Sequence, residues 1–183
     1  IFISTGRPVA LINNITDIRH LVDGYITFNG AYCFMGNREF VLSPIPESDV
    51  QTMLADAEKR NYCVAVCGKK EVIIHNYKKV FTDVFVNELG VNNVDENKTI
   101  ANLKGQPILQ MTPFFTEDEE KVIMPEIPHC VSARWHPAFT DITVKGANKG
   151  NALITVARQL ALDINECIAF GDGGNDLSIL KAA

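Results

Sequence analysis

The hydrophobic and polar residues of this chain recur with two periods, and each period predicts an element of structure. Apolar residues spaced three and four apart predict amphipathic helices at 9–21, 47–60 and 152–162. Further helices are predicted at 78–89, 117–124 and 177–181, with a helical turn within 91–103. Apolar runs bounded by turn residues predict strands at 1–4, 24–28, 31–35, 39–42, 62–67, 71–75, 107–112, 131–135, 139–144 and 167–170.

Two turn-rich stretches, 43–46 and 145–150, divide this pattern. The segments outside them follow the order of a doubly wound α/β unit, which has a parallel sheet. The region between them alternates helices with hairpins. We therefore predict an α/β core, residues 1–45 and 146–183, split in sequence by an inserted α/β domain, residues 46–145.

The composition is that of a globular protein, with 46% hydrophobic and 21% charged residues among 183. A net charge of -5 argues against a general binder of nucleic acid or membrane surfaces. There is no apolar run of about 18 residues and no signal-peptide pattern. The odd number of scattered cysteines predicts reduced, mostly buried thiols and a cytoplasmic location; they are Cys33, Cys63, Cys67, Cys130 and Cys167.

Both ends of the chain fall inside predicted elements. It begins at Ile1, without Met, in an apolar run, and it ends at Ala183 in a predicted helix. We expect it to be a piece of a longer protein.

The loop GDGGND at 171–176 follows the predicted strand 167–170 and precedes a helix. In an open parallel sheet, ligands bind at the carboxyl ends of the strands. Asp172 would lie there, as a hard-oxygen ligand for Mg²⁺. The alternative is an ordinary turn in which Asn175 or Asp176 caps the helix.

The stretch Ser4-Thr5-Gly6-Arg7 has the residues of a phosphate-binding loop. A Thr hydroxyl and the Gly6 N–H can donate to phosphate oxygens at the start of a helix. The alternative is that Ser4 or Thr5 only caps that helix.

Lys149 is predicted at a helix N-terminus, where a cation opposes the helix dipole and a bound anion would explain it. The alternatives are an exposed linker lysine, or that Lys145 takes this role. Gathered at one sheet edge, the three loops would supply the hydroxyl, ammonium and carboxylate of a magnesium-assisted phosphoryl-transfer site. Trp135 and His136, in the turn WHPAF, either face a substrate or pack within a hairpin.

Four motifs together carry a family resemblance: ISTGRP at 3–8, FNGAY at 28–32, NKGNAL at 148–153 and AFGDGGNDLSIL at 169–180. The set resembles the haloacid dehalogenase (HAD) superfamily, specifically the Cof-type sugar-phosphate phosphatases with a large α/β cap. The resemblance covers essentially the whole chain. It implies a Rossmann-like HAD core with a parallel sheet, and it makes the inserted domain the cap that closes over the site.

The resemblance also implies roles for single residues. Thr5 would bind the transferring phosphoryl group, Lys149 would steady it, and Asp172 would ligate Mg²⁺. Asp176 would order the loop and the metal shell. The substrate-binding residues implied are Ser4, Gly6, Arg7, Asn29, Gly30 and Asn175.

The family's nucleophile and acid/base aspartates lie in a DxDGT-type motif on the first strand, and this chain has no such motif. The resemblance implies that they lie before Ile1, on a strand between 1–4 and 167–170. We expect the chain alone not to hydrolyse substrates by the family mechanism.

The sequence thus predicts magnesium-dependent hydrolysis of small phosphomonoesters, sugar phosphates foremost, through an aspartyl-phosphate intermediate. We expect a monomer or weak dimer whose partner is a small phosphate ester. Within enzymes, the alternatives are a phosphomutase or a phosphatase specific for sucrose phosphate or a nucleotide. Outside them, the alternative is a non-catalytic phosphate-binding or regulatory module.

Overall fold

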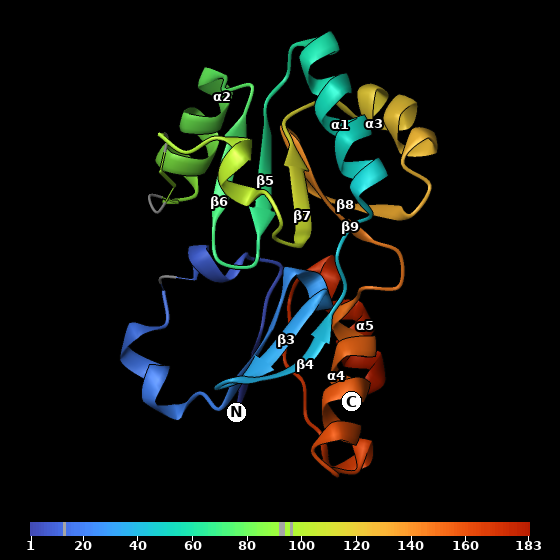
Figure 1. Ribbon diagram of the computed structural model, residues 1–183. Helices are drawn as coiled ribbons and strands as arrows, with labels where there is room; N and C mark the ends of the chain where they lie inside the picture. Colours follow the sequence, from blue (N-terminus) through green and yellow to red (C-terminus); the bar gives the residue numbers. More distant parts are fainter. Residues whose placement is uncertain (13, 92–93, 96) are drawn as a thin grey trace. The chain divides into compact units, whose positions relative to one another are not determined.

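The computed structural model describes residues 1–12, 14–91, 94–95 and 97–183 (Figure 1). These residues form two compact units. The split unit combines two stretches that are distant in sequence, Ile1–Ser43 and Gly146–Ala183, and the continuous unit is Pro44–Lys145. None of the helices in the described part of the chain has the length and apolar character needed to cross a lipid bilayer.

The split unit is a four-stranded sheet covered by two helices. Its regular elements are β1 (Phe2–Ser4), β2 (Gly24–Thr27), β3 (Tyr32–Met35), β4 (Arg38–Leu42), α4 (Lys149–Gln159) and α5 (Leu177–Ala182). Single 3₁₀ segments occur at Val9–Leu11, Thr16–Leu21, Phe28–Gly30, Ile164–Glu166 and Gly174–Asp176. The strand order is β1-β2-β3-β4, with β1 and β2 parallel and the other neighbours antiparallel. The predicted strands of this stretch, from 1 to 42, are confirmed to within a few residues.

The core of the split unit lies between its sheet and α4 and α5. Ala152 and Val156, four positions apart on α4, point to the same side and are buried. The buried members of this core are Ile26, Cys33, Phe40, Ala152, Val156 and Ile179. Helix α4 begins three residues before the predicted start, at Lys149, because the Asn148 side chain caps it by accepting from Asn151 N at 2.8 Å.

The predicted amphipathic helix at 9–21 is wrong. The structure has two separate 3₁₀ segments there, and Asn13 lies outside the described residues. Leu11 is buried, but Ile18 and Leu21, predicted on the same apolar face, are 45% and 51% exposed. The segment is rich in β-branched residues and asparagine, which disfavour a helix, and neither 3₁₀ segment has a side-chain cap.

The predicted strand at 167–170 is also wrong. This segment has no strand structure, and Ile168 and Phe170 are 82% and 90% exposed. A strand requires a hydrogen-bonded neighbour, and no described strand pairs with these residues. The apolar residues at 167–170 alone were therefore not enough to predict a strand, because the sequence pattern does not show whether a neighbouring strand is present.

The continuous unit is a five-stranded antiparallel sheet with helices. Its elements are α1 (Glu47–Arg60), β5 (Val64–Gly68), β6 (Val72–His75), α2 (Lys79–Phe81), β7 (Ile108–Pro113), α3 (Glu117–Ile123), β8 (Cys130–His136) and β9 (Phe139–Val144). The strand order is β6-β5-β7-β9-β8. The predicted helix at 78–89 is α2 followed by a π-helical segment, Thr82–Glu88. The predicted turn within 91–103 is a 3₁₀ segment, Ile100–Leu103; residues 92–93 and 96 lie outside the described residues.

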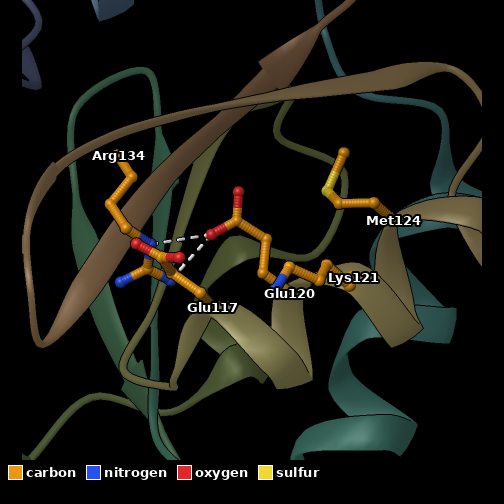
Figure 2. Close-up of a pocket in the computed structure, with 5 residues that line it drawn as sticks. All are labelled: Glu117, Glu120, Lys121, Met124 and Arg134. Carbon is orange, nitrogen blue, oxygen red and sulfur yellow. Dashed lines mark hydrogen bonds and ion pairs between the residues drawn. The ribbon is translucent and has the colours of Figure 1, made fainter.

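Helix α3 is fixed to β8 by an ion pair (Figure 2). The Arg134 guanidinium donates to Glu120 through Nε at 2.8 Å, and its Nη2 lies 2.7 Å from the same carboxylate oxygen. Arg134 also donates to the carbonyls of Phe115 and Phe139, at 3.2 and 3.1 Å. At the start of α3, Thr116 and Glu119 form a reciprocal capping box.

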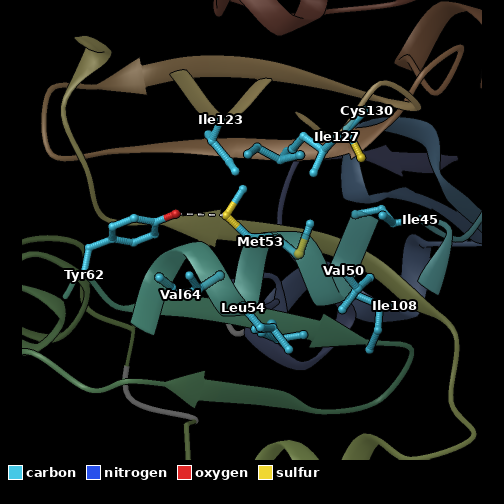
Figure 3. Packing of buried hydrophobic residues seen from close by; sticks show 14 of the residues in the cluster. Ile45, Val50, Met53, Leu54, Tyr62, Val64, Ile108, Ile123, Ile127 and Cys130 are labelled. Atoms are coloured by element: carbon cyan, nitrogen blue, oxygen red, sulfur yellow. Dashed lines mark hydrogen bonds between the residues drawn. The ribbon is translucent and has the colours of Figure 1, made fainter. Parts of the chain in front are cut away.

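The main core of the continuous unit lies between its sheet and α1 and α3 (Figure 3). Helix α1 has the predicted bounds. It contributes Val50, Met53, Leu54 and Ala57, whose spacing places them on one face. The helix ends where Asn61 adopts a left-handed φ of 63°. Met53 is fully buried, and its Sδ lies 3.4 Å from the Tyr62 hydroxyl, which donates its hydrogen to Asp56 Oδ2 at 2.7 Å.

Replacing Met53 with Ala should therefore destabilise the continuous unit. We expect a loss of about 2–5 kcal/mol in the free energy of unfolding, because a cavity replaces a fully buried side chain. Chemical denaturation measures it. Gln51→Ala, at an exposed site of the same helix, should change it by less than about 0.5 kcal/mol. Equal losses in the two variants would contradict this packing.

Candidate functional site

Four loops of the split unit meet at one place, although they are far apart in sequence. They are 4–7, 28–30, 148–150 and 171–176. Asn29 N donates to Thr5 O at 3.3 Å, and Asn175 Nδ2 donates to Asn29 Oδ1 at 3.0 Å. A Cβ added to Gly30 would lie 2.4 Å from Asn148 O. The structure therefore brings together the loops that the sequence singled out.

The loop 28–30 is the connection between the other loops. Phe28, Asn29 and Gly30 have φ angles of 52°, 54° and 98°, three left-handed residues in succession. This is costly for the two residues that carry a Cβ, and such strain persists where surrounding contacts hold it. Here Phe28 N donates to Arg7 O at 3.4 Å, in addition to the bonds of Asn29. Asn29, which the resemblance implies as a substrate-binding residue, is a buried link between two loops.

The loop 4–7 presents hydroxyl groups that no helix uses. The adjacent 3₁₀ segment has Pro8 as its N-cap and no side-chain cap, so the alternative of a capping Ser4 or Thr5 is wrong. Thr5 Oγ1 accepts from Arg7 N at 3.1 Å and keeps its own hydrogen to donate. Ser4 Oγ is buried and has no hydrogen-bond partner among the described residues. The Arg7 guanidinium donates to Leu11 O at 3.4 Å.

Lys149 is buried and forms an ion pair. It is 4% exposed, and its Nζ donates to Asp176 Oδ1 at 2.5 Å. The alternative of an exposed linker lysine is therefore wrong. Lys145, the competing residue, is exposed and belongs to the continuous unit.

Asp176 is held by more than the lysine. Its Oδ2 accepts from the backbone N–H of Gly173 at 3.0 Å and of Asp172 at 3.3 Å. Burial raises the pKa of Asp176, but the hydrogen bonds from Lys149 and these N–H groups outweigh it and hold the pKa below its ordinary value. Asp176 occupies the N-cap position of α5 without a side-chain capping bond. Its carboxylate instead orders the loop that precedes the helix.

Asp172 is the residue predicted to be a ligand for Mg²⁺. It is exposed, and its side chain has no bond to any other described residue. Among the described residues, no group of three or more His, Cys, Asp and Glu side chains gathers in one place. Mg²⁺ commonly takes one or two carboxylates together with water and substrate phosphate. Asp172 therefore fits as one hard-oxygen ligand of such a site.

Ser178 is a part of this arrangement that sequence reasoning missed. Gly150 N donates to Ser178 Oγ at 3.2 Å, and a Cβ on Gly150 would lie 2.3 Å from Ser178 O. Gly150 thus allows α4 and α5 to approach each other, which positions Lys149 beside Asp176. Gly150 was the one sign in the sequence of a close approach here. Its partner, Ser178, could be identified only from the fold. Together the four loops gather hydroxyl, ammonium and carboxylate groups that can bind a phosphoryl group.

We expect Gly171→Ala to destabilise the split unit by about 1–3 kcal/mol. The added Cβ would lie 2.4 Å from Asp176 Cβ, on a side chain that cannot move without breaking its bonds. Thermal or chemical unfolding measures the loss. In the same loop, a Cβ on Gly174 meets nothing within 4 Å, so Gly174→Ala should be neutral or slightly stabilising. Similar effects of the two substitutions would refute this packing.

Lys149→Met should raise the pKa of Asp176, because burial remains while the cation is lost. In the native chain the lowered pKa stabilises the fold above the unfolded value of about 3.9, and this stabilisation is lost as the pH falls through the folded pKa. In the variant, the free energy of unfolding should therefore fall less as the pH is lowered through this range. Carboxyl ¹³C NMR titration measures the pKa, with Lys145→Met as the control. An unchanged Asp176 pKa in Lys149→Met would rule out the ion pair.

Comparison with known proteins gives matches over the whole chain. The family model of haloacid dehalogenase-like hydrolases matches residues 1–183. The chain is 25% identical over 183 residues to "Putative phosphatase YkrA" of Bacillus subtilis (strain 168), and the match covers 99% of this chain and 69% of that protein.

Two solved structures are similar as well. The HAD subclass IIB sugar phosphatase BT4131 shares 39% identity at a TM-score of 0.89, covering all of this chain and 71% of that one. The HAD phosphatase BT1666 from Bacteroides thetaiotaomicron shares 28% identity at a TM-score of 0.81, covering all of this chain and 68% of that one.

Proposed function

Because the chain belongs to the haloacid dehalogenase-like hydrolases, we propose that it takes part in magnesium-dependent hydrolysis of small phosphomonoesters, sugar phosphates foremost. The family, the HAD fold and the class of enzyme, a phosphatase, are those that the sequence predicted. The substrate, the metal and the residue roles are our proposal. The observation that supports it most is the buried Lys149–Asp176 pair beside the hydroxyl-bearing loop 4–7.

In the proposed site, the loop 4–7 receives the phosphoryl oxygens. The hydroxyl groups of Ser4 and Thr5 and the N–H of Gly6 donate to them. Arg7, through its backbone N–H, fixes the orientation of Thr5 Oγ1. Ser4 Oγ, buried without a partner among the described residues, gains one when phosphate binds.

Lys149 has three N–H donors and gives one to Asp176. The other two N–H groups of Lys149 would donate to the phosphate, whose negative charge would balance that of the ammonium group. Asp176 keeps Lys149 in place and orders the loop, so its role is positioning. Asn29, Gly30 and Asn175 hold the loops around the substrate.

Asp172 would hold Mg²⁺ through one carboxylate oxygen. The ion, when bound, would neutralise charge on the phosphate. We propose that an aspartate outside these 183 residues attacks phosphorus in line, that the alcohol leaves, and that water then cleaves the aspartyl phosphate. Residues 46–145 are proposed as the cap that selects the substrate, and residues 1–45 and 146–183 as the core. A cytoplasmic location, a monomer or weak dimer, and the absence of a nucleic-acid partner stay predictions.

Asp172→Asn should reduce magnesium-dependent phosphatase activity of the full-length protein by about a hundredfold or more, because an amide is a poorer ligand for Mg²⁺. Hydrolysis of p-nitrophenyl phosphate and of a panel of sugar phosphates, with and without Mg²⁺, measures it.

The control is Asp163→Asn, an exposed aspartate of the same unit that caps a 3₁₀ segment. Its activity should stay within about twofold of the native value. Native rates in Asp172→Asn, or activity independent of Mg²⁺, would defeat the proposal. Phosphate transfer to a second sugar would favour a phosphomutase, and no turnover would favour a binding module.

A further inference from the structure

Asp141 on β9 is a buried carboxylate that is hydrogen-bonded by neutral groups. Its Oδ1 accepts from Gln110 Nε2 at 3.0 Å and from Thr112 Oγ1 at 2.8 Å, and its Oδ2 accepts from Trp135 Nε1 at 3.0 Å. The donors belong to β7 and β8, so the whole cluster lies within the continuous unit. Asp141 is 7% exposed, and no cation pairs with it in the described part of the chain.

A carboxylate that is removed from water is stabilised by a cation or by taking up a proton. At Asp141 the neutral donors compensate only in part. Burial raises the pKa of Asp141 to about 6, against the lowering effect of the bonds from Trp135 and Thr112. Asp141 therefore takes up a proton at a pH where an ordinary aspartate, with a pKa of about 3.9, stays ionised.

The hydrogen bonds indicate which oxygen of Asp141 takes the proton. Oδ1 already accepts two hydrogen bonds, one for each of its lone pairs, whereas Oδ2 accepts one, from Trp135. The open acceptor position is therefore on Oδ2. A proton there turns Oδ2 into a hydroxyl oxygen, which accepts a hydrogen bond more weakly than a carboxylate oxygen does. The bond that weakens is the bond from Trp135.

The cluster also lacks a hydrogen when Asp141 is ionised. The Gln110 amide gives its two hydrogens to Asp141 and to Thr112 Oγ1, and the Thr112 hydroxyl gives its own to Asp141. Gln110 Oε1 is buried and has no hydrogen-bond partner in residues 1–183 as far as they are described. Acceptors thus outnumber donors in this cluster, and an added proton reduces the imbalance.

Trp135 is the residue whose freedom depends on this bond. Its side chain is 57% exposed, and its ring packs edge-to-face on Phe139, with ring centroids 4.8 Å apart. The hydrogen bond from its Nε1 to Asp141 fixes the orientation of the indole. Because one side of the ring lies in solvent, weakening this bond leaves the ring room to move.

The strands that pack beside Asp141 contribute one other titratable group, the thiol of Cys67 on β5. Burial and then the charge of Asp141 raise the pKa of Cys67, so the thiol stays neutral when Asp141 titrates. Residues 108–113 of β7 and 139–144 of β9 include no other titratable side chain.

The charged groups of β8 are engaged elsewhere. The Arg134 guanidinium is bound to Glu120 of α3. His136 Nε2 lies 3.2 Å from Glu88 Oε1, in the π-helical segment Thr82–Glu88. The His136 ring is 6.1 Å from that of Trp135, so His136 is the group whose titration has to be separated from that of Asp141.

We propose that Asp141 is a proton-binding residue that controls how firmly Trp135 is held in the continuous unit. With Asp141 ionised, the indole N–H is bound and the exposed ring is fixed. With a proton on Oδ2 this bond weakens and the ring gains motion. This pH-sensitive device acts within one unit, and it is independent of the proposed phosphatase activity.

The test follows the indole N–H of Trp135 by NMR in the full-length protein, labelled with ¹⁵N-tryptophan. The variant Trp135→Phe identifies the signal by its loss. As the pH falls from about 8 to about 4.5, the indole proton should move upfield with a midpoint near pH 6, because its hydrogen bond weakens. In Asp141→Asn the signal should not change with pH, since the group at this position no longer titrates.

His136→Gln is the matched control, because it removes the neighbouring titratable ring and keeps Asp141. This variant should retain the transition of the indole signal. A transition that persists in Asp141→Asn, or that disappears in His136→Gln, would overturn the proposal. The absence of any transition in the native protein would overturn it too.

A reciprocal measurement does not need the Asp141→Asn variant to fold. Since proton binding weakens the bond from Trp135, removal of that bond must strengthen proton binding. In Trp135→Phe, carboxyl ¹³C NMR should show Asp141 binding its proton about tenfold more tightly, a midpoint about one pH unit higher. Val131→Ala, at an exposed position of the same strand, should change the affinity less than twofold. An unchanged Asp141 midpoint in Trp135→Phe would refute the coupling.

Discussion

The candidate site depends on one buried ion pair. Lys149 begins α4, where the helix dipole disfavours a cation, and it is almost fully buried. Such a lysine is tolerable only beside a compensating charge, and Asp176 supplies it. Since Asp176 also accepts two backbone N–H groups, the same carboxylate fixes the loop that carries Asp172. The positions of the ammonium group and of the proposed metal ligand are therefore coupled.

Local patterns predicted much of the fold because local forces decide it. Helix α1 has the predicted bounds, since its apolar spacing and its left-handed end at Asn61 agree. Residues 9–21 show the opposite case, in which apolar spacing was right for a helix but the residue types were not. Residues 167–170 needed a neighbouring strand, which no local pattern reveals.

The candidate site was predictable in its residue types and less so in its contacts. The motifs identified Thr5, Lys149 and Asp172 because hydroxyl, ammonium and carboxylate groups near glycines suit phosphate and metal. They did not reveal that Asn29 joins two loops or that Ser178 supports Gly150, because these contacts link residues from different parts of the chain. A buried cluster of hydrogen-bonded side chains was found only in the structure, where three strands bring its members together; they are Gln110, Thr112, Trp135 and Asp141.

We propose that the four converging loops form one phosphate-binding site. Backbone amide NMR of this chain, titrated with inorganic phosphate in the presence of Mg²⁺, can test this proposal. We expect the resonances of Thr5, Gly6, Lys149 and Gly173 to shift together with a common affinity, and those of the continuous unit not to follow this site. Shifts confined to one loop, or absent from all four, would contradict it.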